Sequence, residues 1–369
     1  MAERVTLKTI AAALGVTTTT VHRALQGKEG ISEETRREIQ RVAKRMGYRA
    51  NYMAATLKRK GVHIAIALPE PIGDSRYYYG SMWRGVRLFL SEVVDFNVLP
   101  LEYSYRFVYG ANGNTLERIY EEAKLDGVLT MGVDQGQSSY YIRKLKERGV
   151  PIVLVGSDMY RDVRFCCVRA YDEMAGSLAA ELLTAFDGDA SPKKILVAGH
   201  FGQLGMTDQI RNVNSFERCL ASTAPHITPI HVRNEDPAAW AKEMEKILER
   251  EKNVYAAYSC SARYTVYLAN LLEQLGLVGK LKAIGSDLFD ESAGFLRKGT
   301  LSAVIDKKIA RQSYLATKTL FDYIVKNEMP RSDSLQIRPE IILGKSMGLA
   351  MDKAAHLSED STFGDILVM

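Results

Sequence analysis

The N-terminal stretch Leu7–Leu25 reads LKTIAAALGVTTTTVHRAL and decides the fold of the first part of the chain. Its first half has the i, i+3, i+4, i+7 apolar spacing of one helix face, at Leu7, Ile10, Ala11 and Leu14. Thr6 is a suitable N-cap for that helix and Gly15 a suitable stop. After a short turn, Thr17 can cap a second helix with the apolar face Val21, Ala24 and Leu25. Two short helices joined by a tight turn that contains glycine predict a helix-turn-helix.

A third helix is predicted downstream, with Ser32 as its N-cap and Gly47 as its stop. Its inward-facing residues are Ile39, Val42, Ala43 and Met46. The charge of this region differs from that of the rest, because residues 1–60 hold 13 Lys and Arg against 5 Asp and Glu, whereas the remainder holds 36 against 39. Such an excess of positive charge is expected of a surface that faces phosphate groups.

The second helix of a helix-turn-helix lies in the major groove of DNA, with its N-terminal residues at the base edges. Here those residues are Thr18, Thr19, His22 and Arg23. Arg23 can donate two hydrogen bonds to O6 and N7 of a guanine, so we expect it to read a base directly. For His22 two interpretations stay open, a contact with DNA or an exposed side chain without a partner.

Residues 48–60 form a short basic stretch that is too small to fold alone, because isolated helices of that length are marginal in water. Between Arg41 and Lys60 there are seven basic residues and no acidic one, so DNA is the expected partner of this stretch. Leu57 precedes Lys58, Arg59 and Lys60, and we expect it to enter the minor groove as an apolar wedge between base steps.

Three segments of this region, Val5–Leu25, Ile31–Arg36 and Gly47–Asn51, resemble the LacI family of bacterial repressors. The resemblance implies that residues 51–60 are a hinge helix, which orders on operator DNA in a homodimer. The sequence departs from the family at two positions, because Ala50 stands where proline is usual and His22 where serine is usual. The expected contacts with a pseudo-palindromic operator come from Thr6, Thr17, Thr18, Thr19, His22, Arg23, Asn51, Leu57 and Lys58.

From Val62 onward, short apolar runs alternate with amphipathic helical stretches. The runs are Val62–Leu68, Asn97–Leu101, Gly127–Met131, Ile152–Val155, Ile195–Ala198, Tyr255–Ser259, Leu281–Ile284 and Ala303–Ile305. Such alternation predicts βαβ units, and the length of the region favours two doubly wound parallel-sheet subdomains. The family resemblance implies the fold of periplasmic sugar-binding proteins, with chain crossings near Met159–Arg164, Asp306 and Pro330.

The expected organisation is therefore an all-α headpiece followed by an α/β effector-binding domain. Its boundaries are 1–50 for the helix-turn-helix, 51–60 for the hinge, 61–345 for the effector-binding domain and 346–369 for a C-terminal tail. Within the domain, we expect an N-subdomain of about 61–162 and 306–329, and a C-subdomain of about 163–305 and 330–345.

Ligands of doubly wound sheets lie beyond the carboxyl ends of the strands. The polar and aromatic residues that follow predicted strands are Asp74, Tyr77, Tyr78, Trp83, Asp134, Asp158 and Asp287. Aromatic rings combined with carboxylates suit a sugar, although aromatic clusters also occur as plain core. The family resemblance adds an effector-binding arginine at Arg211, where the spacing is one residue longer than usual and Asn212 is the alternative.

Lys307 stands where the resemblance leads us to expect a neutral polar residue. If its ammonium group reaches the cleft, the effector is acidic, such as a sugar acid or a phosphosugar. If it does not, Lys307 is a solvated residue of a chain crossing. Both interpretations stay open at the level of the sequence.

Motifs of other protein classes are missing from the sequence. It contains no P-loop, no dinucleotide-binding glycine motif, no nucleophile elbow and no H-E-x-x-H, so an enzyme is not expected. The six histidines lack ligand spacing and the four cysteines form no C-x-x-C, so neither a metal nor a cofactor is expected. No apolar run is long enough for a membrane span and no secretory signal is recognisable, which favours a cytoplasmic protein.

The sequence therefore predicts a DNA-binding transcriptional regulator, expected to be a repressor, that responds to a sugar or a sugar derivative. The stretch from Gly344 to Met369 lacks leucine heptads, so we expect a homodimer rather than a tetramer. The alternatives are a transport-type sugar-binding protein and an enzyme-derived α/β protein, both without operator specificity.

Overall fold

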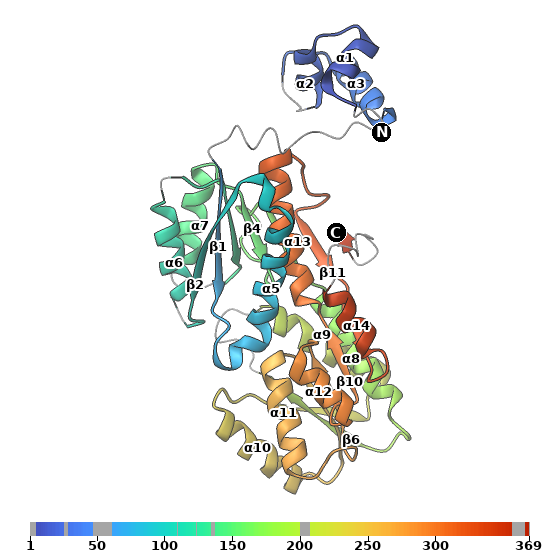
Figure 1. Ribbon diagram of the computed structural model, residues 1–369. Coiled ribbons are helices and arrows are strands. Elements are labelled where there is room, and N and C mark those ends of the chain that lie inside the picture. Colours follow the sequence, from blue (N-terminus) through green and yellow to red (C-terminus); the bar gives the residue numbers. More distant parts are fainter. Residues whose placement is uncertain are drawn as a thin grey trace.

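The computed structural model describes residues 5–25, 29–46, 61–108, 110–122, 124–133, 137–199, 207–355 and 366–368. Figure 1 shows a small helical unit, followed by two α/β subdomains, each with its own sheet. The predicted hinge, with Asn51, Leu57 and Lys58, lies outside the described residues. Within the described ranges, no helix is long and apolar enough to cross a membrane.

The headpiece, residues 5–46, consists of α1 (Leu7–Leu14), α2 (Thr18–Leu25) and α3 (Glu33–Arg45). All three predicted caps are confirmed, because the hydroxyls of Thr6, Thr17 and Ser32 accept hydrogen bonds from backbone N–H groups three residues on, at 3.3, 3.1 and 3.1 Å. Gly15 ends α1 in the left-handed conformation, with φ of 63°. The buried core of the unit is Ile10, Ala11, Val21, Ala24, Ile39, Val42 and Ala43.

The N-subdomain is built on a seven-stranded sheet with the order β13-β11-β5-β4-β3-β1-β2. Its strands are β1 (Val62–Pro69), β2 (Val98–Tyr105), β3 (Gly127–Met131), β4 (Ile152–Val155), β5 (Cys166–Ala170), β11 (Ser334–Ile337) and β13 (Ile366–Val368). All neighbours pair in parallel except β13, which is antiparallel to β11. The 3-10 turns η1 (Gly73–Ser75) and η2 (Val94–Phe96) also belong to the N-subdomain.

Helices cover both faces of this sheet (Figure 1). One face packs against α5 (Arg76–Glu92) and α13 (Ile309–Phe321), which continues into the π-helical turn η3 (Asp322–Lys326). The other face packs against α6 (Ala111–Tyr120) and α7 (Ser138–Glu147). Alternate residues of β1 pack on opposite faces of the sheet. Ile64 and Ile66 pack on the face of α5 and α13, and Ala65 and Ala67 on the face of α6 and α7. A strand buried on both faces needs the unbroken apolar run seen in the sequence.

The C-subdomain is built on a six-stranded sheet with the order β12-β10-β9-β8-β6-β7. Its strands are β6 (Lys193–Ala198), β7 (Ile227–Val232), β8 (Val254–Ser259), β9 (Lys282–Ser286), β10 (Ala303–Asp306) and the antiparallel β12 (Glu340–Ile342). Its helices are α8 (Asp172–Ala185) and α9 (Thr207–Thr223) on one face, α10 (Pro237–Arg250), α11 (Ala262–Gln274) and α12 (Asp290–Lys298) on the other, and α14 (Met347–Ala355).

The expected fold class, a helical headpiece followed by two doubly wound subdomains, is confirmed, but two boundaries need correction. Residue 162 is too early as the end of the first N-subdomain segment, because β5 pairs with β4 and the chain changes sheets only after Ala170. Residues 330–345 do not all belong to the C-subdomain, since β11 pairs with β5 and only β12 joins β10. Part of the expected tail is also a strand of the N-subdomain, namely β13. The segment Cys166–Ala170 was missed because Arg169 interrupts its apolar run.

Candidate nucleic-acid interface and ligand site

The helix α2 presents a polar face to solvent. Thr18, Thr19, His22 and Arg23 are exposed, whereas Val21 and Ala24 on the opposite side are buried in the headpiece core. Thr6 and Thr17 are exposed at helix starts, where their hydroxyls serve as caps. The assignment of these six residues to DNA contact stays a prediction, and their exposure leaves them accessible to a duplex.

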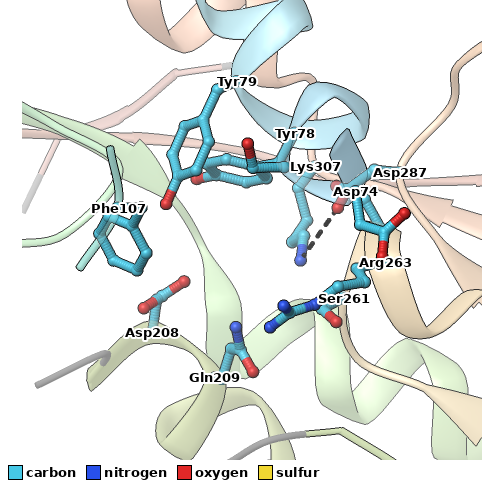
Figure 2. A pocket seen from close by; sticks show the side chains of 12 residues that line it. Asp74, Tyr78, Tyr79, Phe107, Asp208, Gln209, Ser261, Arg263, Asp287 and Lys307 are labelled. Carbon is cyan, nitrogen blue, oxygen red and sulfur yellow. Dashed lines mark ion pairs between the residues drawn. The ribbon is translucent and has the colours of Figure 1, made fainter. Parts of the chain in front are cut away.

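A cavity of about 150 Å³ lies between the two subdomains, where strand ends of both sheets meet (Figure 2). Engineered cavities of about this size hold one benzene molecule, so the space suits a ligand no larger than a single sugar ring. The side chains that line it are Asp74, Ser75, Tyr78, Tyr79 and Phe107 from the N-subdomain, and Asp208, Gln209, Ser261, Ala262, Arg263, Asp287 and Lys307 from the C-subdomain and its crossing.

An ion pair between Asp287 and Lys307 forms one wall of the cavity. The Lys307 Nζ lies 3.4 Å from Asp287 Oδ2 and donates a hydrogen bond of 3.1 Å to the Cys260 carbonyl. Asp287 follows β9 directly and adopts a positive φ of 69°, a conformation that is costly for a residue other than glycine. The backbone N–H of Asp287 donates to the Ile305 carbonyl at 2.9 Å, which fixes the carboxylate at this strand end.

Burial governs the protonation of this charged wall. It raises the pKa of Asp287 to about 6, although the nearby Lys307 opposes the shift. Burial also raises the pKa values of Asp208 and Asp172, again against the effect of Lys307. For Lys307, burial favours the neutral amine, but the carboxylates of Asp287, Asp172 and Asp208 outweigh it and raise its pKa. Lys307 is therefore a charged ammonium that several carboxylates already neutralise.

Aromatic rings form the opposite wall. The ring centroids of Tyr79 and Phe107 lie 5.5 Å apart, and those of Tyr78 and Tyr79 lie 5.2 Å apart. Figure 2 shows the rings of Tyr79 and Phe107 on the same side of the cavity as the Asp208 carboxylate. Tyr78 and Tyr79 stand in the first turn of α5, which directly follows β1 and the short η1 turn at the cleft. A wall of rings facing carboxylates can stack against and hydrogen-bond a polyhydroxylated ring.

Three contacts join the subdomains beside the cavity. The Tyr267 hydroxyl donates to Asp74 Oδ2, and Arg76 forms an ion pair of 3.4 Å with Glu291. The ring of Tyr77 packs against Phe289 of the C-subdomain with centroids 5.2 Å apart. These contacts link α5 and η1 to the C-subdomain on this side of the cavity.

The structure places four of the predicted effector residues in the cavity wall, Asp74, Tyr78, Asp287 and Lys307. Asp134 lies outside the described residues. Arg211 and its alternative Asn212 are not among the lining side chains, and Asn212 accepts a hydrogen bond of 2.7 Å from the Tyr258 hydroxyl. Tyr77 lies beside the cavity rather than in its wall, in the contact with Phe289.

Two predicted effector residues are corrected to structural roles. Trp83 is buried in the N-subdomain core, and its indole N–H donates to the Pro69 carbonyl at 2.8 Å. Asp158 is buried in ion pairs with Arg164 and Arg161 at 2.7 and 3.1 Å, so both of its carboxylate oxygens face guanidinium groups beside β4. Both residues were predicted as effector contacts because they follow strands, but neither side chain lines the cavity.

Sequence reasoning missed several lining residues, among them Tyr79, Phe107, Asp208, Gln209, Ser261 and Arg263. Ser261 and Arg263 follow the predicted strand Tyr255–Ser259, so the strand-end rule would have found them had it been applied there. Asp208 and Gln209 stand in the first turn of α9, whose start the sequence did not predict. Phe107 follows β2, where the prediction considered no candidate.

Two family profiles match this chain. The profile described as the periplasmic binding protein domain matches residues 117–328, more than half of the chain. The profile described as bacterial regulatory proteins, lacI family, matches residues 6–51. The chain is a lacI-family protein with a periplasmic binding protein domain. The lacI-family match covers the headpiece, and the periplasmic binding protein match covers the middle of the two subdomains, from within α6 to just after η3.

Similar proteins include curated regulators and solved structures. Catabolite control protein A of Staphylococcus epidermidis is 26% identical over 162 residues, which cover 42% of this chain and 44% of the relative. This lacI-family chain thus aligns with less than half the length of that curated relative. A protein designated a LacI transcriptional regulator from Bacteroides fragilis has a TM-score of 0.69 at 18% identity, covering 79% of this chain and 99% of its own. The glucose-galactose binding protein GanP of Geobacillus stearothermophilus has a TM-score of 0.65 at 21% identity, covering 78% and 99%. These likenesses to solved structures establish the fold.

Proposed function

We propose that this chain is a homodimeric, sequence-specific DNA-binding regulator, acting as a repressor, whose operator affinity is controlled by a small polyhydroxylated ligand. The observation that carries the proposal is the cavity between the subdomains, with aromatic rings beside Asp208 on one side and the ion pair of the buried Asp287 with Lys307 on the other. The exposed α2 face supports the DNA-reading part, because Arg23 and the threonines are free of the headpiece core.

A single sugar ring is the ligand class that fits this cavity. Rings stack on the apolar faces of a sugar, and carboxylates accept hydrogen bonds from its hydroxyls. The acidic sugars that Lys307 suggested are disfavoured, because Asp287 and the other carboxylates already neutralise its ammonium group. GanP, a relative in fold, is described as a glucose-galactose binding protein, which agrees with this ligand class.

The crossings between the subdomains provide the route from ligand to DNA. Lys307 lines the cavity from the crossing between β10 and α13, and its carbonyl accepts a hydrogen bond of 2.7 Å from Gln312 of α13. Its neighbour Lys308 forms an ion pair of 2.6 Å with Glu340 at the crossing between β11 and β12. A ligand that binds one closure of the cleft more tightly therefore shifts the crossings, and with them the N-subdomain that follows the headpiece.

Selection from random DNA duplexes with the full chain tests the DNA-reading part. We expect enrichment of an inverted repeat. The affinity of the protein for this repeat should change when a sugar is added that also raises the thermal midpoint of the protein. The variant Val21→Asp, which places a charge in the headpiece core, should lose DNA but keep the ligand-induced thermal shift. Two results would favour the transport-type alternative. Either the chain enriches no DNA sequence, or its DNA affinity stays the same with every ligand that stabilises the protein.

A further inference from the structure

The charges that line the ligand cavity are distributed unevenly. Figure 2 draws Lys307 and Asp287 together, on the side away from Phe107 and Asp208, while the guanidinium of Arg263 lies beside Gln209. Lys307 is held by Asp287 at 3.4 Å, and Arg263 is an exposed side chain that water screens. The end of the cavity formed by Asp208, Tyr79 and Phe107 therefore carries a carboxylate and two rings.

Some acceptor atoms in the cavity lack a hydrogen-bond donor. Oδ1 of Asp287 and Oδ1 of Asp208 are buried without a hydrogen-bond partner in the described part of the chain, whereas Oδ2 of Asp287 has the ion pair with Lys307 at 3.4 Å. Asp287 itself is 1% exposed, and its strained backbone holds the carboxylate in the cavity wall. Buried acceptors without donors cost free energy, so a ligand that supplies N–H or O–H groups to these oxygens is favoured.

The aromatic end adds a second, independent preference. The face of an aromatic ring is electronegative and attracts an ammonium group within about 6 Å of its centre. Tyr79 is 4% exposed, and its ring is fixed by packing against Phe107 and by the T-shaped contact with Tyr78. A cation that leaves water loses its hydration. The electronegative ring faces and the adjacent carboxylate together can replace that stabilisation.

We propose that the ligand is a sugar that carries an ammonium group, and that this group binds at the Asp208 end of the cavity against Tyr79 and Phe107. The hydroxyls of the same ring then donate to Asp287 at the other wall. The inference rests on the proposed function, because it takes the cavity to be the effector site. Burial raises the pKa of Asp208 although Lys307 and Arg211 oppose the shift, and a bound ammonium group would lower this pKa further.

Calorimetric titration of the full chain with three matched sets of sugars tests the ligand class. The sets are the free amino sugars glucosamine, galactosamine and mannosamine, their N-acetylated forms, which keep the ring but lose the charge, and glucose, galactose and mannose. We expect at least one free amino sugar to bind ten times more tightly than its neutral and its N-acetylated counterparts.

The variant Asp208→Asn keeps the shape of the side chain and removes its charge. It should weaken the amino sugar at least tenfold while changing the affinity for a neutral sugar less than threefold. Asp95→Asn removes an exposed carboxylate from the η2 turn and should change neither. The fluorescence of Trp83 and Trp240 shows whether each variant is folded.

The outcomes separate the two proposals. Neutral sugars that bind as tightly as their amino forms, or equal losses of both in Asp208→Asn, would overturn the ammonium site and leave the regulator proposal standing. A chain that binds DNA selectively but none of the three sets would overturn both the ammonium site and the sugar effector.

Discussion

The headpiece and the cavity place their polar side chains in opposite ways. The headpiece presents Thr18, Thr19, His22 and Arg23 on an exposed face above a small apolar core. The cavity turns its charges inward, with Asp287 and Lys307 buried between two sheets. Exposed side chains can be substituted with little change in the free energy of unfolding, whereas substitution of buried charged side chains changes it strongly. Substitutions should therefore separate binding from stability in the headpiece and combine them in the core.

The largest expected effect comes from Lys307→Met. It leaves the buried Asp287 carboxylate without its counter-charge, which should lower the free energy of unfolding of the core by about 3–5 kcal/mol. Denaturation followed by tryptophan fluorescence reports on the core alone, because the chain has two tryptophans, Trp83 and Trp240, and both lie in the subdomains. The double variant with Asp287→Asn should regain much of the loss. A single variant as stable as the parent would show that the pair is not desolvated.

The pH dependence of core stability should come next. The pKa of Asp287 rises from 3.8 to about 6 on folding, so between these values the native state keeps a proton that the unfolded state has released. The free energy of unfolding should therefore fall as pH rises through this window, by on the order of 3 kcal/mol from this group, and then level off. In Asp287→Asn the part of the decline that comes from this carboxyl should vanish, whereas the parts that come from Asp172 and Asp208 should remain. In the headpiece the sign is reversed at Glu38, whose pKa a hydrogen bond from Arg41 lowers.

Arg23→Ala should affect DNA reading without affecting stability. Loss of a bidentate contact with guanine costs about 1–3 kcal/mol and relaxes the preference at one base pair of each half-site. Arg37→Ala is the matched control, because it removes the same charge from the exposed surface of α3. It should weaken binding to all sequences alike. Identical base preferences in the parent and Arg23→Ala, measured by selection from random duplexes, would exclude the base contact.

The smallest effect should come from Thr6→Ala, which deletes the N-cap of α1. Loss of such a cap costs about 1 kcal/mol, and this loss should fall on the headpiece alone. Far-ultraviolet circular dichroism would show an earlier helical melt, while tryptophan fluorescence stays unchanged. Thr18→Ala, at an exposed position of α2, is the control and should leave both signals in place. A shift in the fluorescence transition would mean that headpiece and core unfold together.

The same contrast explains how much the sequence could predict. The headpiece helices depend on neighbours three or four residues apart, so caps such as Thr6 and Ser32 and the core positions Ile10 and Val21 were predicted correctly. The strands β1, β3 and β4 were equally accessible, because strands buried on both faces are continuous apolar runs.

The cavity could be predicted only in part, because its walls come from segments that only the tertiary fold brings together. The strand-end rule found Asp74, Tyr78 and Asp287, but it could not distinguish them from Trp83, which turns into the core, or Asp158, which pairs with Arg164. The side of a helix that faces a cleft depends on packing, which a local pattern does not contain. For the same reason Asp208, in the first turn of α9, carried no local signal of its place beside Tyr79.

The edge strand β13 pairs with β11 in a sheet whose first strand begins at Val62. Because a ribosome makes the chain from its N-terminus, the headpiece can fold once residue 46 has emerged, whereas this sheet lacks a strand until Val368 has been added. During synthesis, the unit proposed to read DNA is therefore complete long before the unit proposed to sense a ligand. Under that proposal, each new molecule passes through a period in which its headpiece is folded and its ligand control has not yet been assembled.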